Sequence, residues 1–150
     1  LILGGNLQSL SLGKDTVTFC ISDDPNRIIS FNPHDVRLCE RVTMFWQDAN
    51  TKQKEFEKRA KEEANLEEKD ENGIPINLAK SATLMRETAD WVCDQLDIVF
   101  GKGTAKKVFG DTFTFEDFAL FMQYVFSFFT QESQERVTKR LNKKSGKVMA

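Results

Sequence analysis

Apolar and polar residues alternate in two short stretches near the start of the chain and follow helical spacing through most of the rest. Residues Leu7–Leu12 and Thr16–Ile21 both alternate, and Gly13 lies in the three residues between them. This pattern predicts a β-hairpin with a short turn. The polar run Ser22–Asn26 then predicts a break in the chain, and Ile28–Phe31 predicts a short third strand.

A first long helix is predicted from the motif Asn32-Pro33-His34-Asp35 onwards. Asn can cap free backbone N–H groups, Pro suits the first helical position, and Asp35 complements the positive end of the helix dipole. Beyond Asn50 the apolar positions thin and charged helix formers dominate, which predicts a protruding, solvated helix that ends at Asp70–Pro75. The apolar stripe of the first part comprises Leu38, Val42, Phe45, Trp46 and Ala49.

A second long helix and one short helical turn are predicted next. Asn77 can cap the second helix, and Gly101 ends it. The segment Thr104–Phe109, between Gly103 and Gly110, predicts a single short helical turn. Steps of three and four residues give the second helix an amphipathic stripe made of Leu78, Ala82, Met85, Ala89, Val92, Leu96 and Val99/Phe100.

The last predicted helix is apolar nearly all round. Thr114 caps it, with Glu116 and Asp117 in its first turn, and 8 of the 13 phenylalanines lie between Phe109 and Phe129. Such a helix either fills the core with both faces, or fills it with one and offers the other to another chain. We predict the second arrangement, with a partner-binding set of Phe115, Phe118, Phe121, Met122, Val125, Phe128 and Phe129.

These elements predict a mainly α (α+β) fold, in which a short N-terminal β-hairpin precedes a bundle of three main helices. Residues 1–142 are expected to form one domain and residues 143–150 a basic flexible tail, because 136–147 holds six basic residues and no acidic one. A net charge of −2 is too small to favour nucleic acid or a membrane as the partner of the whole chain. Cys20, Cys39 and Cys93 lie far apart without a CxxC pair, which favours reduced thiols in a cytoplasm.

The sequence offers little catalytic chemistry. His34 beside Asp35 fits a helix start better than an acid–base pair, and Gly101-Lys102-Gly103-Thr104 lacks the longer Gly-rich loop of a phosphate-binding motif. The carboxylates Asp90, Asp94 and Asp97 fit a solvated helix face better than a cation site. We therefore expect a protein that is not an enzyme and has no cofactor and no metal site.

Three stretches together resemble a known family. They are Asp23–Asp35, Asp94–Thr104 and Lys107–Asp111, the last followed by the phenylalanine-rich segment. Over about Leu7–Leu141 the chain resembles the tail assembly chaperones of long-tailed bacteriophages and prophages of Gram-positive bacteria. Where that family often has an acidic residue between the two glycines, this chain has Lys102.

The resemblance implies a non-enzymatic role in the cytoplasm of the bacterial host. Such chaperones bind the long, apolar, helical tape-measure protein, keep it soluble and help to recruit tail-tube subunits, and they are absent from the finished virion. The resemblance also implies self-association. Two other hypotheses stay open at this point: a structural virion protein (a tail or head–tail connector subunit), and a small DNA-binding regulator, whose candidate recognition helix is too apolar for a DNA groove.

Overall fold

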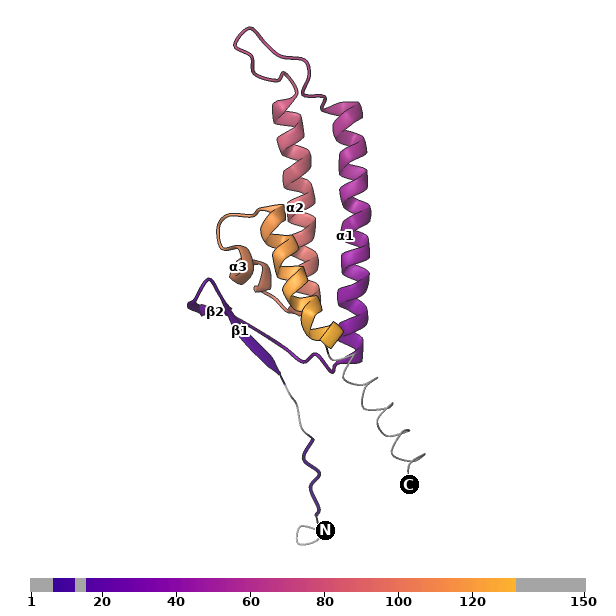
Figure 1. The fold of residues 1–150 in the computed structure, drawn as a ribbon, viewed down its shortest axis with the longest axis vertical. Coiled ribbons are helices and arrows are strands. Elements are labelled where there is room, and N and C mark those ends of the chain that lie inside the picture. Colours follow the sequence, from indigo (N-terminus) through magenta and orange to yellow (C-terminus); the bar gives the residue numbers. More distant parts are fainter. Residues whose placement is uncertain (1–6, 13–15, 132–150) are drawn as a thin grey trace, which may run out of the picture.

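The computed structural model describes residues 7–12 and 16–131. Its elements run in the order β1 (Val17–Ile21), β2 (Asp24–Phe31), α1 (Val36–Glu63), α2 (Leu78–Phe100) and α3 (Thr104–Phe109). A further helix over 115–131, which we call the phenylalanine-rich helix, reaches the end of the described part. Figure 1 shows α1 and α2 as a long helical hairpin, with the phenylalanine-rich helix beside only its lower half. The predicted class, a hairpin followed by helices in an α+β fold, is confirmed.

The hairpin uses a different pair of strands from the one predicted. β1 pairs antiparallel with β2, whereas Leu7–Leu12 forms no strand, so the predicted partner of β1 is wrong. Ser22 and Asp23 make the turn with φ angles of 52° and 58°, and positive φ at both positions is what a type I′ turn requires. The register then jumps, and a bulge accommodates Pro25, which has no N–H to donate to a ladder.

Asp35, and not Asn32, is the N-cap of α1. The Asp35 carboxylate accepts hydrogen bonds from the backbone N–H groups of Arg37 at 3.0 Å and Leu38 at 3.2 Å. The predicted continuation of this helix beyond Asn50 is confirmed, but the helix ends at Glu63, before the predicted stop. The stripe is confirmed by four buried side chains, Leu38, Val42, Phe45 and Ala49.

The predicted apolar stripe of α2 is buried only in its second half. Val92 and Leu96 are buried, but Leu78 is 47% and Met85 44% exposed, and Leu84 is buried in their place. The reason lies in the arrangement of the helices. The upper half of α2 has only α1 beside it, because the phenylalanine-rich helix runs along the lower half (Figure 1). The upper part of the stripe therefore has no third helix to cover it.

The core lies on both sides of the phenylalanine-rich helix. On the side of α1, the ring of Phe118 lies 5.6 Å from Phe45, and the completely buried side chains of the core are Val42, Val92, Leu96, Met122 and Val125. On the side of the sheet, the ring of Phe31 stacks on Phe129 at 5.6 Å, and the ring of Phe19 lies 6.4 Å from Phe121. Both apolar faces of this helix therefore find partners within the chain.

The short helix α3 has the predicted bounds and is held at both ends by charged side chains. At its N-terminus, Asp97 Oδ1 accepts a hydrogen bond from the backbone N–H of Ala105 at 2.8 Å. At its C-terminus, Arg27 donates through Nε to the carbonyl of Lys107 and through Nη2 to that of Val108, both at 2.6 Å. An anion at the N-terminus and a cation at the C-terminus both suit the helix dipole. Arg27 thereby ties the hairpin to the helical part.

Candidate partner-binding groove

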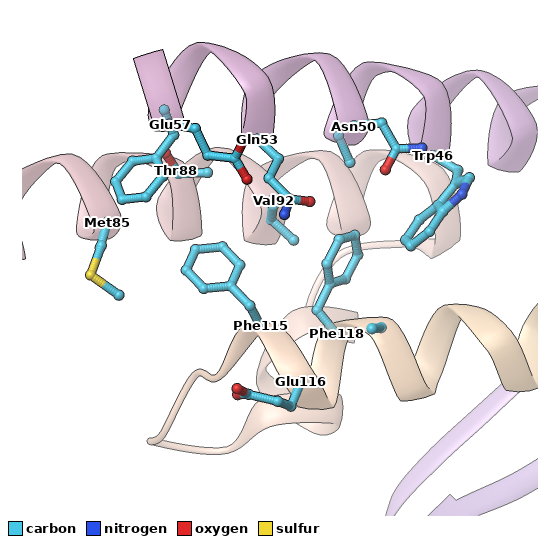
Figure 2. Close-up of a pocket in the computed structure, with 13 residues that line it drawn as sticks. Trp46, Asn50, Gln53, Glu57, Met85, Thr88, Val92, Phe115, Glu116 and Phe118 are labelled. Atoms are coloured by element: carbon cyan, nitrogen blue, oxygen red, sulfur yellow. The ribbon is translucent and has the colours of Figure 1, made fainter. Parts of the chain in front are cut away.

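An open groove runs between α1, α2 and the first turns of the phenylalanine-rich helix (Figure 2). Its volume is about 400 Å³. We call it the helical groove. Its lining residues are Trp46, Ala49, Asn50, Gln53, Phe56, Glu57, Met85, Thr88, Val92, Phe115, Glu116, Phe118 and Ala119.

The floor of the helical groove is made of packed apolar side chains. Val92 of α2 and Phe118 are both buried in the core. The ring of Phe118 lies 5.6 Å from Phe45 and 5.8 Å from Trp46, two rings carried by α1. Tilted and edge-to-face ring pairs at these distances stabilise one another, so the floor is preorganised.

Phe115 lies at the open end of the groove and is half-buried. Figure 2 shows its ring pointing up toward α1 and α2, between Met85 and Phe118. Its ring lies 5.0 Å from Phe113, which in turn lies 4.6 Å from Phe109. This row of rings fixes Phe115 before any partner arrives.

The rim of the groove is polar. Asn50, Gln53 and Glu57 come from one face of α1, and Glu116 comes from the first turn of the phenylalanine-rich helix. Figure 2 shows Gln53 and Glu57 above the ring of Phe115. An apolar floor surrounded by polar groups is the usual anatomy of a site that buries an apolar ligand group.

The groove continues along α2 as an uncovered apolar stripe. Met85 lines the groove, and Ala82 and Leu78 follow it on the same helix face toward the start of α2. From Leu78 to Val92 this track is about 21 Å long at 1.5 Å per residue. It has the length of a partner helix of about four turns.

The structure separates the predicted partner-binding residues into three places. Phe115 and Phe118 line the helical groove, although Phe118 is buried in its floor. Phe128 is half-buried, with its ring 5.8 Å from Phe31. The others belong to the core and have almost no exposed surface: Phe121, Met122, Val125 and Phe129. Their burial follows from the position of the helix between the sheet and the helical hairpin.

Sequence reasoning missed Trp46 and Met85 as groove residues, because both lie on stripes that predict core positions. A signal was present in the lengths of the elements. The apolar stripe of α2 begins at Leu78, and the helix pair α1 and α2 is longer than the apolar part of the phenylalanine-rich helix. A stripe longer than the helix that covers it must leave apolar surface outside.

Three of the carboxylates considered for chemistry have structural roles. Asp35 caps α1 and Asp97 caps α3, while Asp90 forms an ion pair with Arg86 at 3.5 Å. Partial burial, together with the neighbouring carboxylates, raises the pKa of the Cys93 thiol. Within residues 7–12 and 16–131, no three His, Cys, Asp or Glu side chains are grouped so that they could hold a metal ion.

Fold and groove together define an α+β protein with a helical hairpin that the phenylalanine-rich helix covers along its lower half only. No helix in the described ranges is long and apolar enough to cross a membrane. The chain belongs to a family of unknown function, DUF6673, which matches residues 26–148 and so includes the whole groove. No curated protein and no solved structure matches the chain.

Proposed function

We propose that this protein is a non-enzymatic tail assembly chaperone of a long-tailed bacteriophage or prophage, acting in the host cytoplasm. In this proposal it binds the tape-measure protein, helps to recruit tail-tube subunits and self-associates. The resemblance of Asp23–Asp35, Asp94–Thr104 and Lys107–Asp111 to that family supports the identity of the partners. The observation that carries the binding role is the helical groove with its uncovered continuation on α2.

The groove suits an amphipathic helix. A partner helix can lie in line with the phenylalanine-rich helix, on the upper halves of α1 and α2, and there complete a three-helix arrangement. Met85 and Leu78 are about half exposed, and Phe115 is half-buried. Covering each of them removes apolar surface from water and contributes on the order of 1–2 kcal/mol. Helices recognised in this way present apolar anchors at i, i+3 or i+4, and i+7.

The exposed surface of α1 suits a protein that keeps an apolar partner in solution. From Lys52 to Glu63 this helix carries mostly charged side chains, and Arg59 bridges α1 to Glu87 of α2 at 3.8 Å. A tape-measure protein exposes long apolar stripes before the tube surrounds it. With one stripe held in the groove, the outer face of the complex is the charged face of α1.

The proposal is tested by co-expressing the tagged protein with candidate tail proteins and measuring which of them co-purify. Met85→Asp places a charge in the groove, and Met44→Asp is a matched control. Met44 is 54% exposed and lies on another face of α1, outside the groove. The proposal predicts that wild type and Met44→Asp retain the tape-measure protein and that Met85→Asp loses it.

Two results would contradict the proposal. One is that no tail protein co-purifies with the folded wild-type protein. The other is that Met85→Asp and Met44→Asp retain the partner equally well. Because both methionines are substantially exposed, neither substitution is expected to unfold the chain, and circular dichroism checks this directly.

A further inference from the structure

The segment Leu7–Leu12 carries three leucines that no described part of the chain covers. Leu7 is 86%, Leu10 82% and Leu12 73% exposed, more than any other large apolar side chain of the described residues. Figure 1 shows this segment running away from the helices. We call it the N-terminal arm. Three exposed leucines within six residues form an unusual apolar surface for a chain in water.

The strand next to this arm has an unpaired edge. The sheet has two strands in the described part of the chain, so β1 pairs with β2 on one side only. Alternate residues of β1 differ in exposure. Phe19 and Ile21 are half-buried toward the core, whereas Thr18 and Cys20 are exposed on the other side. A free edge next to an apolar face is a template for another strand.

The arm has the pattern that such a strand needs. Leu10 and Leu12 are two residues apart, with Ser9 and Ser11 on the opposite side of an extended chain. Paired with β1, the leucines would extend the row of Phe19 and Ile21, and the serines would join Thr18 and Cys20 at the surface. The helix-facing side also offers apolar surface, because Leu120 is 62% and Tyr124 47% exposed beside Phe19.

We propose that the N-terminal arm of a second copy of this chain pairs antiparallel with the free edge of β1. The second copy is the occupant because the matching segment is present in every chain and, in the single chain, forms no strand and keeps its leucines exposed. Reciprocal exchange of two arms gives a closed twofold dimer in which each sheet gains a third strand. Three strands over a helix are also a more stable unit than two.

This inference specifies the self-association that is part of the proposed function, but it rests on the arm and on β1 instead of the helical groove. Either can therefore fail alone. If the protein dimerises but binds no tail protein, the proposed function fails and the arm exchange does not. If the protein binds tail proteins as a monomer, the arm exchange is refuted and the proposed binding role is not. The arm is tested with the purified full chain and no partner.

The first test uses the exposed thiol of Cys20. In a chain carrying Cys39→Ser and Cys93→Ala, Ser9→Cys or Ser11→Cys is introduced and oxidised with copper phenanthroline. Cross-strand neighbours on one face of a sheet are close enough for a disulfide. Arm exchange predicts a covalent dimer on a non-reducing gel. A disulfide within one chain would show that the arm folds back onto its own β1, and no disulfide from either position would show that it does not reach β1; both overturn the proposal.

The second test measures self-association by sedimentation equilibrium. Leu10→Asp with Leu12→Asp is expected to weaken dimerisation at least a hundredfold, because it removes two buried leucines from each arm. Ser9→Asp with Ser11→Asp adds the same charge to the solvent side and is expected to weaken it less than tenfold. A wild-type protein that is monomeric at all concentrations, or equal effects of the two double variants, would overturn the proposal.

Discussion

Phe121 gives the sharpest test of how the phenylalanine-rich helix is used. Its side chain is only 5% exposed, and its ring lies 5.7 Å from Phe100 and 6.4 Å from Phe19. It therefore packs between α2 and the sheet. Phe121→Ser is accordingly a core substitution and not a change to a binding surface.

The magnitude follows from the burial. Removing a buried phenyl ring costs about 3–5 kcal/mol, and burying an unpaired hydroxyl in its place adds about 1–3 kcal/mol. We expect Phe121→Ser to lower the free energy of unfolding by about 4 kcal/mol or more. Domains of this kind are stable by about 5–15 kcal/mol, so the variant is expected to be marginally folded.

The assay is urea unfolding followed by circular dichroism. With an m-value of about 2 kcal/mol/M, the expected loss moves the midpoint down by about 2 M. Ile98→Ser is the control, since Ile98 is 67% exposed on α2, and its effect is expected to stay below about 1 kcal/mol. A loss under about 1 kcal/mol for Phe121→Ser would refute the packing of this helix as described.

Two further predictions concern Arg27 and Cys93. Arg27→Met keeps the apolar stem but removes both hydrogen bonds to the end of α3, so we expect it to lower the free energy of unfolding, measured with urea, by about 2 kcal/mol. Arg27→Lys is expected to recover less than half of that loss, because a lysine cannot donate to both carbonyls with the geometry of a guanidinium. If neither variant lost stability, the role of these two hydrogen bonds would be contradicted. The raised pKa of Cys93 lowers its thiolate fraction at a given pH, so its reaction with iodoacetamide should reach half of its maximal rate at a higher pH than that of free cysteine under the same conditions; mass spectrometry follows the rate, and a Cys93 midpoint at or below that of free cysteine would contradict this.

Local signals predicted several elements well. Gly103 and Gly110 flank α3 at its two ends, as expected. Their φ angles of 87° and 65° are values that residues with a Cβ rarely adopt. Thr114 caps the last helix as predicted, accepting a hydrogen bond through its hydroxyl from the Asp117 N–H at 3.0 Å. These features depend on a few neighbouring residues, and sequence spacing contains that information.

The errors arose where the choice depends on distant parts of the chain. β1 had two candidate partners, and the alternating pattern of Leu7–Leu12 favoured the wrong one. The correct turn, Ser22-Asp23, lacks the glycine that normally marks a type I′ turn. Similarly, the stripe from Leu78 to Met85 is a genuine apolar face, but whether it is buried depends on where the phenylalanine-rich helix begins in space.

The candidate site was predictable only in part. The sequence indicated that apolar surface is concentrated in the last helix, but Phe121 and Phe129 meet the sheet and are buried. The uncovered apolar surface lies instead on α2 and around Phe115. Total apolar content can be read from a sequence, whereas the part of it that stays exposed is set by packing.

The most direct test of the helical groove is the fluorescence of Trp46, which lines it. Trp91 does not line the groove, so Trp91→Phe leaves Trp46 as the single tryptophan. Titrating this variant with a helical segment of the tape-measure protein should shift the Trp46 emission to shorter wavelength and reduce its quenching by acrylamide, and both changes should saturate. Adding Met85→Asp to the variant should abolish both changes. An emission that stays constant while the segment binds, or a response that Met85→Asp leaves intact, would contradict the groove as the binding site.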